Sequence, residues 1–152
     1  RLQERPNRQL DIYFIDKVIG QGGYAGSNII ISYLDRDYSG RGLYHVLVHE
    51  AVHVLDRQFA PQRIPFLAEG VAVWASDGHF KEDDLTQRVL AMQATNTYIP
   101  LRDLIDEFYL AQHELGYSQA AGFVNYLVDT DGWQTFRTFT VRLQPISWVG
   151  WL

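Results

Sequence analysis

The stretch Leu47-Val48-His49-Glu50-Ala51-Val52-His53-Val54-Leu55 places two histidines and a glutamate inside a strongly apolar run. Residues four apart on an α-helix lie one turn above each other on nearly the same face. His49 and His53 would therefore direct their rings at one point, where a metal ion would fit. Glu50 would lie about 100° around the helix from His49, within reach of a water molecule on that metal without being a ligand. The pattern H-E-x-x-H thus predicts a metal site with Glu50 as its general base.

The segment around this pattern predicts a buried helix. From Leu43 to about Phe59 the sequence is apolar nearly all the way round, which is typical of a helix at the centre of a domain. Unsatisfied polar groups in such a helix cost ~1–3 kcal/mol each, and this favours a metal-bound state of the histidines. The alternative is that both are ordinary, partly buried histidines bonded to backbone carbonyls.

Two histidines need a third partner, because catalytic zinc sites commonly have three protein ligands and one open position. Glu69 is the best candidate. It lies in the apolar segment Phe66–Ala75, which predicts the next helix, with Pro65 suited to its first turn. A turn between two antiparallel helices would let the second present a carboxylate to the first. The alternative for Glu69 is a surface glutamate.

The remaining pattern places strands first and helices afterwards. Strands are predicted at Leu10–Asp16 and Asn28–Leu34, and the glycine-rich segment Gly20–Gly26 predicts a turn or a strand that something approaches closely. Beyond the two helices already described, helical spacing of apolar residues predicts further helices at Lys81–Ala94, Leu101–Leu110, Ser118–Val128 and Trp133–Leu143. Segregated strands and helices indicate an α+β fold. We expect a single domain over residues 1–152.

Composition excludes several classes of function. The net charge is −5 and lysine occurs only twice, which argues against nucleic-acid binding. Without cysteine there is no disulfide framework, thiolate metal site or cysteine nucleophile. No run of eighteen apolar residues predicts a membrane span. The first residue is not Met, so we expect a processed form or an excised domain of a longer, extracytoplasmic precursor, although compartment and oligomeric state stay open.

Two motifs together resemble a known family. His49-Glu50-Ala51-Val52-His53 followed by Pro65-Phe66-Leu67-Ala68-Glu69-Gly70-Val71-Ala72 is similar to the peptidase MA-like branch of the gluzincins, zinc metallopeptidases with two histidines and a downstream glutamate as ligands. Gly116–Leu127, a tyrosine followed by a small-residue helix, also resembles that family. The resemblance covers roughly residues 11–143. It implies a zincin-like fold, with a small N-terminal mixed β-sheet, a central H-E-x-x-H helix and a mainly helical half.

The resemblance also implies a chemistry. One zinc ion per chain would lower the pKa of a water molecule, Glu50 would take its proton, and a peptide or protein would be the substrate. Tyr117 would donate a hydrogen bond to the oxyanion, and His113 is the next candidate for this role. The alternative for Tyr117 is a packed ring at the beginning of a helix. Gly22–Gly26 would lie near an edge strand where a substrate pairs by its backbone, or would form a hairpin turn.

The sequence departs from the thermolysin-type pattern around the third ligand. Pro65 and Val73 occupy the positions four before and four after Glu69, so neither polar partner of that group is matched. Support for the ligands must come from elsewhere. Asp56, one turn beyond His53, would lie on the metal-facing side or on the helix surface. His45 lies one turn before His49, and we expect it to have a core or substrate-contacting role rather than that of a fourth ligand.

Three functions are compatible with these features. The first is an active zinc-dependent peptidase. The second is a catalytically silent gluzincin-like domain that keeps its metal and serves as a binding or regulatory module. The third is an α+β interaction domain without a metal. The presence of Glu50 beside the three ligands favours the peptidase, because a metal scaffold has no need of a base.

Overall fold

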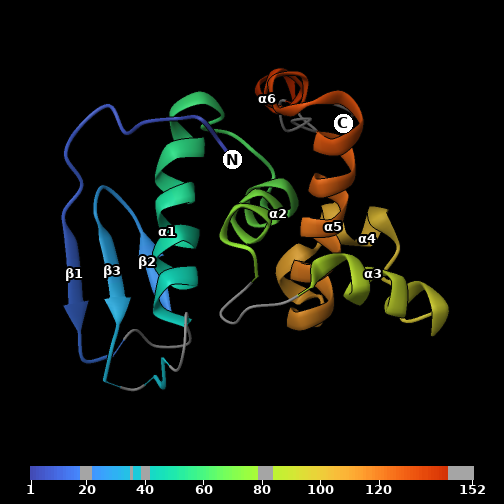
Figure 1. The fold of residues 1–152 in the computed structure, drawn as a ribbon, viewed down its shortest axis with the longest axis horizontal. Helices are drawn as coiled ribbons and strands as arrows, with labels where there is room; N and C mark the ends of the chain where they lie inside the picture. The colour runs from blue at the N-terminus through green and yellow to red at the C-terminus, as the bar shows by residue number, and fades with distance from the viewer. Residues whose placement is uncertain (18–21, 35, 39–41, 79–83, 144–152) are drawn as a thin grey trace, which may run out of the picture.

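The computed structural model describes residues 1–17, 22–34, 36–38, 42–78 and 84–143. Three strands come first and the helices follow (Figure 1), so the predicted α+β class is confirmed. The strands are β1 (Ile12–Ile15), β2 (Gly23–Ala25) and β3 (Ile29–Ser32). The helices are α1 (Gly42–Phe59), α2 (Pro65–Ser76), α3 (Leu85–Ala94), α4 (Leu101–Asp106), the 3₁₀ turn η1 (Phe108–Leu110), α5 (His113–Asp131) and α6 (Trp133–Arg142). Within the described residues no helix is both long and apolar enough to cross a membrane.

The sheet is small and mixed. Its strand order is β1-β3-β2, with β1 parallel and β2 antiparallel to β3. Both predicted strands are confirmed, although each is shorter than predicted. The glycine-rich segment contributes the edge strand β2, while residues 20 and 21 lie outside the described residues. This edge strand packs against α1.

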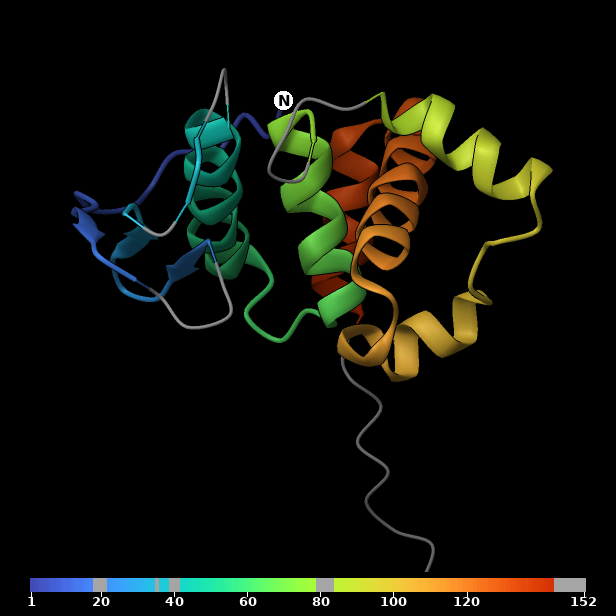
Figure 2. The same cartoon turned by 90° about the horizontal axis from the view of Figure 1, so that it is seen from below.

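Helix α1 lies between the sheet and α2, as both views show (Figures 1 and 2). On one side Val46 and Val54 join Ile29 and Ile31 in a small core under the sheet. On the other side Val52 belongs to a second core, shared with the helices. A helix covered on two sides must be apolar around most of its circumference, which explains the profile seen in the sequence.

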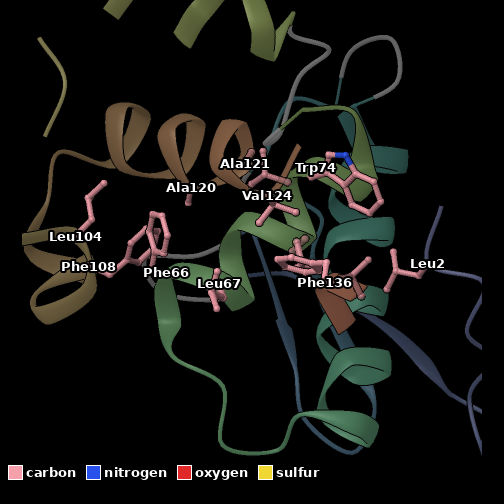
Figure 3. Packing of buried hydrophobic residues seen from close by; sticks show 14 of the residues in the cluster. Leu2, Phe66, Leu67, Trp74, Leu104, Phe108, Ala120, Ala121, Val124 and Phe136 are labelled. Carbon is pink, nitrogen blue, oxygen red and sulfur yellow. The ribbon is translucent and has the colours of Figure 1, made fainter. Parts of the chain in front are cut away.

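The second core lies where α2 packs along α5 (Figure 3). Phe66 of α2 and Ala120, Ala121 and Val124 of α5 are almost fully buried there. Gly70 allows the two helices to approach, because a Cβ at this position would lie 2.7 Å from the backbone oxygen of Ala120. The glycine thereby fixes the place of α2, the helix that carries Glu69.

The helix ends follow their capping residues. Pro65 is in the first turn of α2, as predicted, and α2 ends at Ser76, where Asp77 caps it with a left-handed φ of 60°. The side chain of Asp84 accepts a hydrogen bond from the backbone N–H of Gln87 and so begins α3. The predicted start of that helix at Lys81 lies outside the described residues.

Two predicted helices have different bounds. The segment Leu101–Leu110 is not one helix: Glu107, at φ −136° and ψ 43°, separates α4 from η1. The break buries Leu104 and Phe108 together. Helix α5 begins at His113 rather than at Ser118, because the Gln112 side chain accepts from the backbone N–H of Leu115.

Candidate metal centre

A cleft of about 800 Å³ opens beside α1 and α2. Strand β2 forms one wall, and residues of η1 and α5 form another. The side chains of the motif line this cleft together with three arginines. Two tyrosines, Tyr109 and Tyr117, belong to the helical wall. Its lining residues are Gly22, Gly23, Tyr24, Ala25, Arg36, Asp37, Tyr38, Val46, His49, Glu50, His53, Arg57, Arg63, Pro65, Ala68, Glu69, Tyr109, His113 and Tyr117.

The structure brings Glu69 to both motif histidines. His49 Nε2 lies 3.1 Å from His53 Nε2 and 3.1 Å from Glu69 Oε2, and His53 Nε2 lies 3.3 Å from the same carboxylate oxygen. All three residues are buried. The surface-glutamate alternative is therefore wrong. Three atoms of the kinds that bind transition metals converge on one point, an arrangement that could hold a metal ion.

The electrostatics of Glu69 follow from these contacts. Burial by itself would raise the pKa of this carboxyl, because it penalises the charged form. The hydrogen bonds from His49 and His53 outweigh burial and hold the pKa well below its usual range. Glu69 is thus a carboxylate at neutral pH.

His45 shows by contrast what a structural histidine looks like in this helix. It is fully buried, and its Nδ1 donates a hydrogen bond to the backbone carbonyl of Ser76, so it ties α1 to the end of α2. His49 and His53 instead direct Nε2 at a carboxylate. The expectation of a core role is consistent with this position of His45, which is not among the residues that line the cleft.

Glu50 lies between α1 and the edge strand. A Cβ added to Gly23 would come within 2.8 Å of Glu50 Cγ and 2.9 Å of its Oε1, so the side chain packs directly on the backbone of β2. The sequence predicted a close approach to this glycine segment, and Glu50 is what approaches. Burial raises the pKa of Glu50 to about 7, while the charge of His49 opposes the rise and that of Glu69 adds to it.

No protein-family model, curated protein or solved structure matches this chain.

Tyr117 and His113 are one turn apart on α5, and both line the cleft. Their rings lie 4.3 Å apart between centroids. Burial raises the pKa of Tyr117 above its usual range, and the negative charge of Glu69 raises it further, so the hydroxyl keeps its proton. Helix α5 begins one turn before Tyr117, and the ring also packs on Phe108 with centroids 5.1 Å apart, which fits the alternative of a packed ring near the beginning of a helix.

Asp56 is buried, so the alternative of a surface position is wrong. Its Oδ2 lies 2.6 Å from Nε of Arg63, which follows α1, and Arg63 Nη2 donates to the backbone carbonyl of His53 at 3.4 Å. Burial raises the pKa of Asp56 to about 7, more than the neighbouring Arg63 lowers it. The pair supports the end of α1 through the backbone of His53.

Tyr109 was not predicted from the sequence. Its hydroxyl donates a hydrogen bond of 3.1 Å to Glu69 Oε1. Most of the residue is exposed, but partial desolvation of the hydroxyl raises the pKa of Tyr109 to about 12, with a further contribution from the Glu69 charge. The two residues are forty positions apart and Tyr109 is in a 3₁₀ turn, so no local spacing links them.

Proposed function

We propose that this chain is a zinc-dependent peptidase of the gluzincin type, in which His49, His53 and Glu69 hold the metal and Glu50 is the general base. The observation that carries the proposal is the triangle formed by His49 Nε2, His53 Nε2 and Glu69 Oε2, whose sides are 3.1, 3.1 and 3.3 Å.

The triangle fits zinc. Nitrogen and carboxylate ligands bind zinc at about 2.0–2.2 Å in tetrahedral sites, which places neighbouring ligand atoms about 3.3 Å apart. Two imidazole nitrogens also disfavour magnesium and calcium, which prefer oxygen ligands. A zinc ion bound by these three groups supplies Lewis acidity that makes a nearby water molecule easier to deprotonate and polarises a carbonyl group.

The position of Glu50 supports its proposed role in proton transfer. Glu50 neighbours His49 in the sequence but packs on Gly23 of β2, on the wall of the cleft where a peptide would lie. Its carboxylate accepts a proton from the attacking water and passes it to the leaving amine. Tyr117, whose hydroxyl keeps its proton, is the proposed donor to the developing oxyanion.

The edge of β2 supports a peptide as substrate. Ser32 N–H donates to Gly22 O and Gly26 N–H donates to Asn28 O, so the backbone groups of these two glycines face β3. Alternation along an antiparallel strand then directs Gly23 and Ala25 to the opposite side. Arg57 covers the carbonyl of Ala25 at 2.9 Å. Gly23 is therefore the proposed pairing residue for an extended substrate.

The arrangement of the elements agrees with a zincin-like fold. A small mixed sheet is followed by the helix with the two histidines and then by the helix with the glutamate. This is the order that the resemblance to the peptidase MA-like family implies.

Metal analysis together with peptide cleavage tests the proposal. The purified protein should contain one zinc ion per chain and cleave members of a broad peptide library. Glu50→Gln should keep the zinc and lose cleavage by about 10²–10⁴-fold, the usual contribution of a general base. Glu107→Gln is the matched control, because Glu107 is exposed and lies outside the cleft lining.

Each failure has its own meaning. A wild-type protein that binds no zinc at stoichiometric concentration would overturn the metal site and the peptidase with it. Zinc binding without any cleavage that depends on Glu50 would favour the alternative of a silent gluzincin-like binding or regulatory module.

A further inference from the structure

The two oxygens of Glu69 have different partners. Oε2 lies 3.1 Å from His49 Nε2 and 3.3 Å from His53 Nε2. Oε1 accepts the hydroxyl hydrogen bond of Tyr109 at 3.1 Å. The carboxylate is therefore oriented with one oxygen toward the histidines and the other toward the 3₁₀ turn.

Two successive residues of η1 contact two residues of α2 that share a face. Phe66 and Glu69 are three apart on α2 and so lie side by side. The ring of Phe108 packs on Phe66 with centroids 6.2 Å apart, while Tyr109 reaches Glu69. Phe108 is buried in the helical core and anchors the turn. The Tyr109 hydroxyl is thus held over the carboxylate by a packed neighbour.

From this geometry we propose that Tyr109 is a positioning residue that keeps Glu69 a single-oxygen ligand, with Oε2 on the metal and Oε1 held away from it. The proposal rests on the metal site of the proposed function. Carboxylates bind cations through one or both oxygens, and a second oxygen on zinc would occupy the position that water or substrate needs. Pro65 and Val73, one turn before and one turn after Glu69 on α2, have no side chain that forms hydrogen bonds. The hydrogen bond to Glu69 Oε1 comes instead from Tyr109 on another element.

Tyr109→Phe tests this role, because it removes only the hydroxyl. The side chain is 66% exposed, so the loss of one oxygen atom leaves the core intact. Tyr126→Phe is the matched control: Tyr126 is 64% exposed on α5 and is not among the cleft-lining residues. Zinc affinity is measured by competition with a chelating dye, and the coordination number by the visible absorption of the Co²⁺-substituted proteins. Circular dichroism of the metal-free proteins checks that each variant is folded.

The expected result for Tyr109→Phe is a zinc affinity lower by about tenfold or more, the usual cost of losing a partner of a metal ligand. Its Co²⁺ absorption should also weaken, because four-coordinate cobalt absorbs more strongly than cobalt with additional ligands. Tyr126→Phe should match the wild type in both measurements.

The outcomes separate the two proposals. If the wild type binds zinc and Tyr109→Phe has the same affinity and the same Co²⁺ spectrum, Tyr109 has no positioning role although the metal site stands. If the wild type binds neither zinc nor cobalt, the metal site falls and the role of Tyr109 falls with it.

Discussion

Position 23 in β2 must be glycine if Glu50 is to work as a base. We predict that Gly23→Ala leaves zinc binding unchanged but lowers kcat/KM for peptide cleavage by roughly 10–100-fold. The added methyl group would lie 2.8 Å from Glu50 Cγ and would displace the carboxylate. A displacement of about 1 Å in an active site can lower the rate by up to about 100-fold. The measurement is steady-state cleavage at matched zinc occupancy.

The neighbouring glycine provides the control for this prediction. A Cβ at Gly22 would meet its nearest atoms only at 3.9 Å, an ordinary contact distance. Gly22→Ala should therefore keep near wild-type activity. Equal losses in the two variants would mean that an added side chain at either glycine lowers activity, independently of the contact with Glu50.

Asp56 gives a prediction about pH and stability. Its pKa is raised to about 7 in the folded protein, above the ordinary value of 3.8 that an aspartate has in the unfolded chain. Between pH 3.8 and about pH 7 the Asp56 carboxyl is ionised in the unfolded chain but protonated in the folded protein. The contribution of Asp56 to stability is therefore fully present below about pH 4 and is lost as pH rises through about 7. In Asp56→Asn this contribution is absent at every pH.

The difference in unfolding free energy between the wild type and Asp56→Asn should therefore fall between about pH 5 and about pH 8, by an amount on the order of 2 kcal/mol. Urea unfolding with chelator present measures it, since the chelator removes the separate pH dependence of metal binding. A difference that rises with pH would mean that the ion pair with Arg63 outweighs burial.

Sequence patterns predicted those elements of the fold and of the candidate site that local spacing determines. The motif helix, the glutamate helix with Pro65 in its first turn and the α+β order are confirmed. The break at Glu107 was missed because the apolar spacing from Leu101 to Phe108 is helical throughout. The early start of α5 was missed because its cap is Gln112, and glutamine is not a favoured capping residue.

The contact of Tyr109 with Glu69 could not have been predicted in the same way. It depends on η1 folding back onto α2, and the sequence gives no periodic signal for a contact between segments forty positions apart. The pairing of Gly23 with Glu50 depends likewise on how β2 packs on α1. Local patterns therefore located the candidate ligands, whereas the groups that contact them from other elements follow from tertiary packing.

Packing between elements leads to a prediction at Gly70. Alanine is favoured over glycine inside a helix by about 1 kcal/mol. Here, however, the new Cβ would lie 2.7 Å from a backbone oxygen of α5, which is unable to move without moving its helix. We predict that Gly70→Ala destabilises the protein by roughly 1–3 kcal/mol, and that it weakens zinc binding because Glu69 is the adjacent residue.

Gly116→Ala on α5 is the comparison for Gly70→Ala. A Cβ there would meet side chains at 3.4 Å or more, within ordinary contact, so the helix preference for alanine should leave the protein as stable as the wild type or more so. Chemical unfolding of both variants and a zinc titration are the measurements. A stable Gly70→Ala protein with normal zinc affinity would show that α2 shifts freely against α5.

In the whole molecule the candidate metal centre lies where the two cores meet. Helix α1 packs on the sheet through Val46 and Val54, whereas α2 packs on the helices through Phe66. Because the candidate ligands come from both helices, a bound ion would connect the two parts of the protein directly. Because the unfolded chain does not hold the three ligands together, the free energy of binding would add to the free energy of unfolding.

Thermal unfolding should therefore depend on zinc. At a free zinc concentration about 1,000 times the Kd, zinc binding stabilises the folded protein by about 4 kcal/mol. The Tm of a chain of this size rises by roughly 2–4 °C per kcal/mol, so the Tm in zinc should be roughly 8–16 °C above the Tm in chelator. Glu69→Gln keeps the shape of the side chain but removes the charge that His49 and His53 share, so most of the rise should disappear. Scanning calorimetry of both proteins with zinc and with chelator measures the effect. A wild-type Tm that is the same in zinc and in chelator would contradict the idea that an ion links α1 to α2.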